Sequence, residues 1–250
     1  MNPYSTYIYT LSALKLSRKM KNIVEKEIEK HPKRSTLMII LLFTLLVAFI
    51  GALIQKNWIT MLFILIISIL MCIPMVIGKL SKIDIPFPLE VFSVLFIYAS
   101  LFLGELNHYY TTYWWWDVLL HMASGLAFGI IGFIILYVLS QVEKIQTSPK
   151  LVAIFSFSFA LAIGALWEIV EFTIDRTLGT NMQSGSFFWT NLNGGLLDTM
   201  KDLIDDSIGA LFSGIMGYLY LKKNSGIVVK PMAKEFKKDN PEIFQIEKKK

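Results

Sequence analysis

Six long apolar stretches constrain this chain more than any other feature of its sequence. A helix that crosses a membrane needs about 20 mainly apolar residues, because each residue adds about 1.5 Å along the helix axis. We therefore predict an all-α, polytopic membrane protein, a six-transmembrane-helix bundle with no soluble domain between its helices. The predicted spans are residues 37–54, 58–77, 89–103, 118–140, 151–174 and 202–221.

Composition agrees with a membrane-embedded chain. Apolar residues make up 54% of the 250 residues and charged residues only 17%, against roughly 25% charged residues in an average soluble protein. Cys72 is the only cysteine and lies within an apolar stretch, which excludes a disulfide within the chain and a cysteine-based metal site. The first apolar stretch follows 34 mostly polar residues, so we expect a membrane span there and no cleavable signal peptide.

The distribution of basic residues predicts the orientation of the spans. Lys56, Arg176 and Lys201 are the only Lys or Arg residues on one side of the six spans, and the other 21 of the 24 lie on the opposite side. Cytoplasmic loops carry the excess of Lys and Arg. Both termini should therefore be cytoplasmic, and loops 55–57, 104–117 and 175–201 should face outward.

Charge also divides the chain into three parts. Residues 1–34 carry eight Lys/Arg against three Asp/Glu and form a predicted cytoplasmic, basic, amphipathic segment. Residues 35–221 form the transmembrane domain, and residues 222–250, with nine Lys against four Asp/Glu, form a flexible, Lys-rich cytoplasmic tail.

The basic ends bear on the expected partners. A basic amphipathic helix can lie on an anionic leaflet, so we expect the lipid bilayer as partner, with anionic lipid contacted through the basic termini. Alternatively, these charges only set the topology. Because membrane tethering explains both ends, we expect no nucleic acid partner, and the sequence does not indicate which proteins bind.

Acidic residues and one histidine gather at the outer ends of the last three predicted spans. Asp117 and His121 are four residues apart, and Glu168 and Glu171 are three apart, so each pair shares one face of a helix. Counting about 20 residues outward from the inner end of each span brings the acids of all three helices to the same outer boundary. The sequence therefore predicts an outward-facing acidic and histidine pocket, which the last span enters with Asp198, Asp202, Asp205 and Asp206.

Several carboxylates in a poorly solvated site cannot all stay ionised. They are protonated, paired with Arg176 or Lys201, or bound to a cation. Carboxylates with one imidazole suit a divalent ion such as Mg²⁺, Mn²⁺, Fe²⁺ or Zn²⁺, so a divalent metal ion of unspecified identity is the candidate cofactor. The candidate metal ligands are His121, Glu168, Glu171, Asp202 and Asp206.

Catalytic roles are assigned within the same set. Glu168, Glu171 and Asp202 are the candidate acid–base groups, and three further acids are expected to support the ligands from outside: Asp117, Asp175 and Asp198. Each of these three can instead be an ordinary interfacial charge. Asp205 can simply pair with Lys201, four residues before it.

Small and aromatic residues add two expectations. Gly125, Gly129 and Gly132 in the fourth span and Gly209, Gly214 and Gly217 in the sixth allow close helix approach, so we expect these spans to pack together. The aromatic residues of loop 104–117 suit a membrane-interface belt or a platform on which a substrate stacks. They are Tyr109, Tyr110, Tyr113, Trp114, Trp115 and Trp116.

Short motifs at these positions resemble the bacterial YjdF-like multi-spanning membrane proteins. The likeness covers about residues 35–221 and implies a bacterial cytoplasmic membrane protein without an established reaction. The motifs that carry it are Asp117-x-x-x-His121-x-x-x-Gly125, Trp167-Glu168-x-x-Glu171, Gly179-Thr180 and Asp198-Thr199-x-x-Asp202.

The order of motifs is more distantly similar to the VanZ-like glycopeptide-resistance proteins, which show an early His, then E-x-x-Q, then D-x-x-x-N-x-x-G. Here Glu171 stands at the Gln position, and Asp202, Asp206 and Gly209 fill the last motif with Asp in place of Asn. This likeness implies envelope or lipid-linked chemistry.

Three hypotheses for function follow. The first is a cell-envelope protein whose pocket holds a divalent metal and acts on a lipid-linked or phosphorylated substrate. The second is a cation- or proton-coupled transporter, and the third is a non-catalytic membrane assembly protein whose acids pair with a partner's basic helix. The sequence leaves open whether the chain is an enzyme.

Overall fold

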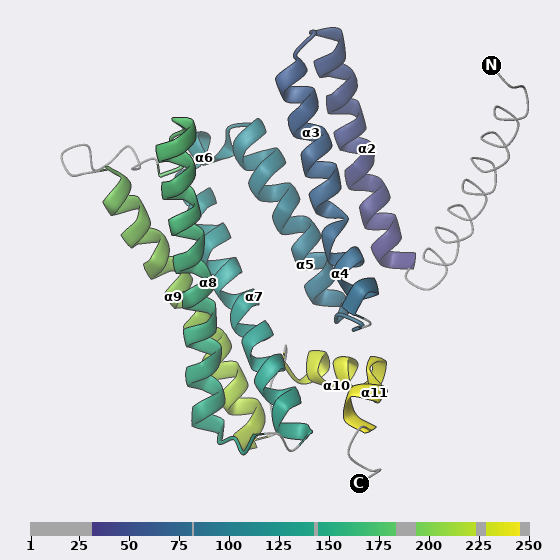
Figure 1. Ribbon diagram of the computed structural model, residues 1–250, viewed down its shortest axis with the longest axis vertical. Coiled ribbons are helices and arrows are strands. Elements are labelled where there is room, and N and C mark those ends of the chain that lie inside the picture. Colours follow the sequence, from purple (N-terminus) through teal and green to yellow (C-terminus); the bar gives the residue numbers. More distant parts are fainter. Residues whose placement is uncertain (1–31, 82, 143–144, 184–193, 224–228, 246–250) are drawn as a thin grey trace, which may run out of the picture. The chain divides into compact units, whose positions relative to one another are not determined.

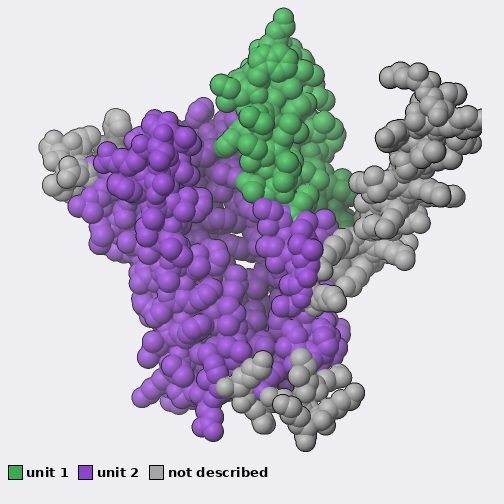
Figure 2. Space-filling view, in the orientation of Figure 1, with its two compact units in different colours: residues 1–72 green, residues 73–250 purple. Residues whose placement is uncertain are grey.

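The computed structural model describes residues 32–81, 83–142, 145–183, 194–223 and 229–245, and all regular structure within these ranges is helical. The chain divides into two compact units, residues 1–72 and residues 73–250 (Figure 2). The predicted amphipathic segment 1–34 lies outside the described residues, except for its last three, which begin the first described helix.

The first unit contains α2 (Pro32–Ile54) and α3 (Trp58–Met71), which form a helical hairpin (Figure 1). The side-chain oxygen of Asn57 accepts a hydrogen bond from the backbone N–H of Thr60 at 3.1 Å, which caps the start of α3. Large apolar side chains stay exposed on both helices, as Phe43 (63%) and Ile59 (83%) illustrate. Such surfaces suit contact with lipid and do not suit contact with water.

The second unit is built on three long helices, α7 (Trp114–Gln141), α8 (Pro149–Leu178) and α9 (Gly194–Lys223), which pack against one another (Figure 1). Helix α7 runs parallel to α9, and α8 runs antiparallel to both. The remaining elements are α4 (Ile73–Ser81), α5 (Phe87–Ile97), the π-helical segment Tyr98–Leu106, α6 (Tyr109–Thr112), α10 (Val229–Asp239) and α11 (Pro241–Gln245).

Five described helical segments are long and apolar enough to cross a membrane. They match the first five stretches expected from the sequence. The sixth stretch lies in α9, which has 30 residues but carries Lys201, Asp202, Asp205 and Asp206 in its first half. The five segments are Pro32–Ile54, Trp58–Gly78, Phe87–Leu106, Trp114–Gln141 and Pro149–Leu178.

Close packing of α7 on α9, expected from their small residues, is confirmed. A side chain at Gly125 would collide with the backbone of Asp206, and one at Gly209 would collide with the backbone of Met122. Further along the same pair, Ser213 fills the space that a side chain at Gly129 would need. Backbone-to-backbone contact therefore fixes how the acidic ends of the two helices face each other.

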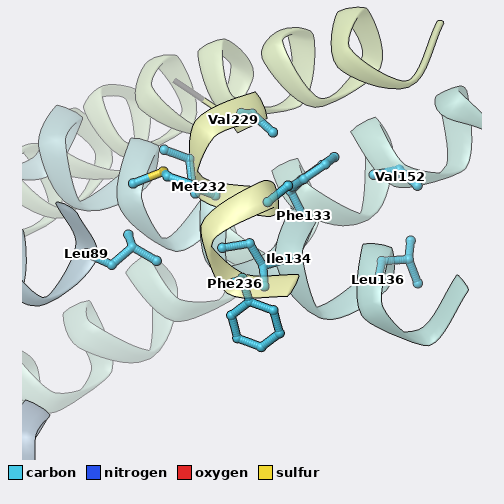
Figure 3. Close-up of a cluster of buried hydrophobic side chains, with 10 residues drawn as sticks. Leu89, Phe133, Ile134, Leu136, Val152, Val229, Met232 and Phe236 are labelled. Atoms are coloured by element: carbon cyan, nitrogen blue, oxygen red, sulfur yellow. The ribbon is translucent and has the colours of Figure 1, made fainter. Parts of the chain in front are cut away.

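Residues 229–245, expected to belong to a flexible tail, contain the helices α10 and α11. Val229, Met232 and Phe236 of α10 are buried against residues of α5, α7 and α8, including Leu89 and Phe133 (Figure 3). Apolar residues spaced three or four apart give α10 a single apolar face. Burial of that face orders the segment despite its lysines.

A buried asparagine fixes this docked segment to the loop before α5. Asn240 is fully buried, its Oδ1 accepts a hydrogen bond from the backbone N–H of Asp84 at 2.7 Å, and its Nδ2 donates to the Asp84 carbonyl at 2.8 Å. Glu235 also accepts a hydrogen bond from the backbone N–H of Phe87 at 3.0 Å. The start of α5 is thereby held by α10 as well as by α7.

Candidate functional site

His121 lies at the centre of a cluster of carboxylates formed by α7 and α9. Its Nε2 is 3.6 Å from Oδ1 of Asp117, one turn earlier on α7, and 3.9 Å from Oδ2 of Asp202 on α9. Its Nδ1 is 3.5 Å from Oδ2 of Asp206. One largely buried imidazole therefore contacts three carboxylates and uses both of its ring nitrogens to do so.

The side chain of Asp206, on α9, contacts both other long helices, α7 and α8. Its Oδ1 accepts a hydrogen bond from the Ser124 hydroxyl of α7 at 2.8 Å, and its carboxyl group occupies the space beside Gly164 of α8. The residue is only 1% exposed. A carboxylate fixed in this way orients the imidazole and selects which ring nitrogen carries the proton.

Lys201 contacts the opposite oxygens of the same carboxylates. Its Nζ is 3.1 Å from Oδ2 of Asp117 and 3.2 Å from Oδ1 of Asp202. It is also 3.7 Å from Oδ2 of Asp205, the pairing considered above as the alternative role of Asp205. Arg176, the other basic residue considered for this role, lies over the ring of Phe172, 5.3 Å from its centroid.

Glu168 and Glu171 are buried on α8, one turn apart. Glu171 accepts a hydrogen bond from the indole N–H of Trp167 at 2.8 Å. Glu168 is 4% exposed, and neither of its carboxyl oxygens has a hydrogen-bond partner among the described residues. Because burying an unpaired carboxylate is costly, this side chain is the most unusual feature of the site.

The surroundings of Glu168 link it to the His121 cluster. The charges of His121 and Asp206 act on its carboxyl group, and the side chains of Thr199 and Gln183 lie close by. Gln183 donates a hydrogen bond from Nε2 to the Thr199 hydroxyl at 2.6 Å. Glu168 therefore belongs to the same site as His121, with polar groups of the segment after α8 beside it.

Of the three acids expected to support the ligands, the structure places two in the cluster. Asp117 contacts His121 and Lys201 directly, and Asp198 is buried one turn before Asp202 on α9. Asp175 instead accepts hydrogen bonds from the hydroxyl of Thr180 at 2.5 Å and from the backbone N–H groups of residues 182 and 183 at 2.8 and 3.0 Å. Those bonds hold the turn that follows α8.

Aromatic residues that lead into α7 adjoin the site. The ring of Tyr110 packs on Gly104, and Asp117 and Asp202 lie close enough to act on its phenol. Burial, aided by the negative charge of Asp117, raises the pKa of the Tyr110 phenol, which therefore remains a hydrogen-bond donor. Sequence reasoning placed Tyr110 in an aromatic belt, and no sequence signal separates it from its neighbours.

The donor set can be tested against a metal ion. One ligand atom from each of Asp117, His121 and Asp202 lies within 4.8 Å of the other two. Carboxylate oxygens and an imidazole nitrogen suit a hard or borderline divalent cation. Asp206 on the far imidazole nitrogen is the partner that a metal-ligating histidine commonly has. Among the described residues, these three fit a divalent ion.

Comparison with protein families agrees with the membrane character of the chain. A model of predicted membrane proteins, DUF2238, matches residues 35–223. The chain belongs to the DUF2238 family. The matched region covers all six apolar stretches and every acidic residue of the site. No curated protein and no solved structure matches the chain significantly, and the finer likenesses to YjdF-like and VanZ-like proteins stay predictions.

Proposed function

We propose that this DUF2238 protein crosses the bacterial cytoplasmic membrane six times with both termini in the cytoplasm, α9 being the sixth span. The acids of α9 argue for this placement, because Asp202 and Asp206 are each about 1% exposed and face α7 and α8. Ionisable residues within membrane spans face the bundle interior and pair there. Under this topology the His121 cluster lies at the outer face, and the Lys-rich C-terminal segment contacts anionic lipid on the inner face.

The proposed activity of the outer site is binding of one divalent metal ion that acts on a lipid-linked or phosphorylated envelope substrate. The observation that carries this proposal is the arrangement of His121, with Nδ1 toward Asp206 and Nε2 toward Asp117 and Asp202. A bound divalent ion supplies Lewis acidity toward a phosphoryl or carbonyl oxygen.

Roles for the individual side chains follow from their positions. His121, Asp117 and Asp202 would hold the ion, and Asp206 would orient the imidazole. Glu168 would complete the ligand set or transfer protons, because its buried carboxyl group has no hydrogen-bond partner among the described residues and a carboxyl group can accept and release a proton. Glu171 would act beside it from the next turn of α8.

Packing beyond the site favours a one-sided pocket over a transport path. Phe133 and Ser213 are fully buried where α7 meets α9, and a side chain at Gly217 would collide with the Phe133 ring. An ion or proton path would require polar groups or space through this region. Ion flux in liposomes that stops on Asp202→Asn would nevertheless favour the transporter.

The experiment is metal analysis of the full chain purified in detergent. We expect a stoichiometric divalent ion in the wild-type protein and a loss of at least tenfold in Mn²⁺ affinity in His121→Ala, since supporting contacts alone alter affinity by about 10–100-fold. His108→Ala is the matched control, because this second histidine lies in the turn before α6. A chain without bound metal, or equal affinity in both variants, would refute the metal site.

A further inference from the structure

We propose that the Lys201 ammonium group occupies a second cation position of this centre, so that replacing Lys201 opens a second divalent metal site. The inference rests on the proposed metal at His121 and specifies why the site would hold a single ion. Its basis is the way two carboxylates are shared between the imidazole and the ammonium group.

Asp117 and Asp202 each have one oxygen directed to each side of the centre. Oδ1 of Asp117 and Oδ2 of Asp202 lie 3.6 and 3.9 Å from Nε2 of His121. The other oxygen of each lies 3.1 and 3.2 Å from Nζ of Lys201. Carboxylates that bind two cations through opposite oxygens are the bridging groups expected of a two-metal centre.

Asp205 supplies a third carboxylate on the Lys201 side. Its Oδ2 is 3.7 Å from Nζ and has no hydrogen-bond partner among the described residues. Three carboxylate oxygens therefore surround one point, which the ammonium group fills. Without that positive charge, these oxygens would repel one another and would suit a hard divalent cation.

Glu168 adds a further buried carboxyl group to this centre, and neither of its oxygens has a hydrogen bond of regular geometry among the described residues. The side chain is buried, and the neighbouring charges that act on it include His121 and Asp206. Carboxylates also outnumber cationic groups here, since Lys201 and His121 face seven acids. Such an excess attracts cations. The seven are Asp117, Glu168, Glu171, Asp198, Asp202, Asp205 and Asp206.

The test measures bound Mn²⁺ per chain in the full-length protein after chelation and reloading. We expect Lys201→Met, which keeps an unbranched side chain one atom shorter and removes the charge, to double the bound Mn²⁺. Two Mn²⁺ ions held about 3.5–4 Å apart would also give an exchange-coupled electron paramagnetic resonance spectrum. Lys201→Arg retains the positive charge and should bind as much Mn²⁺ as wild type.

The outcomes separate this inference from the proposed function. Unchanged Mn²⁺ content in Lys201→Met, with metal present in wild type, overturns the inference and leaves the metal site standing. A wild-type protein without bound Mn²⁺ overturns the proposed function. If Lys201→Met then binds Mn²⁺ and wild type does not, the result still supports the inference that the Lys201 ammonium group occupies a cation position. If Lys201→Met does not fold, Lys201→Ala repeats the test. Adding Asp205→Asn should remove the extra ion.

Discussion

Replacing Gly125 by alanine should destabilise the protein, because the added methyl group would meet backbone atoms that cannot move aside without moving a helix. The added Cβ would collide with the carbonyl oxygen and Cα of Asp206, and these are backbone atoms of a closely packed helix. To make room, α7 and α9 must separate. Overpacking of this kind costs about 1–3 kcal/mol.

Gly51 provides a matched control on α2. A Cβ at Gly51 would meet no atom within 4 Å, and Gly→Ala within a helix otherwise stabilises by about 0.5–1 kcal/mol. This helix gain applies to both variants and cancels in the comparison, so we expect the free energy of unfolding of Gly125→Ala to lie about 1–3 kcal/mol below that of Gly51→Ala. Unfolding of both variants in one detergent, followed by circular dichroism, measures this difference.

The same substitution should also weaken metal binding, because the displaced backbone belongs to Asp206. Separation of α7 from α9 lengthens the Ser124–Asp206 hydrogen bond of 2.8 Å and the His121–Asp206 contact of 3.5 Å. A Gly125→Ala protein as stable as Gly51→Ala would refute the reasoning, because it would mean that the two backbones are not in rigid contact.

Three further predictions concern the rest of the second unit. Asn240→Ala should lower the free energy of unfolding by about 1–3 kcal/mol, because it removes the hydrogen bonds of a fully buried side chain to the backbone N–H and carbonyl of Asp84; thermal unfolding beside the exposed control Lys238→Ala tests this, and equal midpoints would contradict it. Phe236→Ala should cost about 3–5 kcal/mol by emptying part of the core under α10, and proteolysis should then cleave the C-terminal segment faster; an unchanged cleavage rate would show that α10 is not held by this core. Asp175→Asn should leave Mn²⁺ affinity at the wild-type level, because the hydrogen bonds of Asp175 go to the turn after α8; a tenfold loss in titration would instead place it among the groups that support the metal.

The membrane helices were predictable because apolar stretches are recorded directly in the sequence. Five of them are confirmed as helices long enough to span a membrane. The sixth stretch is harder to identify as a membrane span, because Asp202, Asp205 and Asp206 lower the mean hydropathy of α9. The contacts of these acids with α7 and α8, which bury them, became visible only in the structure.

Membership of the candidate site was predictable in outline, whereas individual contacts were not. Helical spacing predicted that Lys201 pairs with Asp205, but the Lys201–Asp117 contact joins residues 84 positions apart and depends on how α7 and α9 are rotated. Spacing of four residues placed Asp117 beside His121 on one helix, but it did not reveal that Asp117 also contacts α9. Spacing within one helix does not determine rotation between helices.

The docked C-terminal segment had a sequence signal that its charge obscured. Val229, Met232, Ala233 and Phe236 repeat at helical spacing, which predicts an amphipathic helix. Four lysines between residues 230 and 238 favoured a solvated tail instead. Because an amphipathic helix can face water on one side and protein on the other, the two patterns were compatible.

The position of Asp206 has a consequence for how this site changes during evolution. Its carboxyl group fills space that exists only because residue 164 is glycine, while its backbone requires glycine at residue 125. A relative that carries alanine or serine at position 164 should therefore carry a smaller residue than aspartate at position 206, and so lose the imidazole contact. Aligned relatives should show positions 164 and 206 changing together. This pair of positions would then identify family members that lack the histidine site.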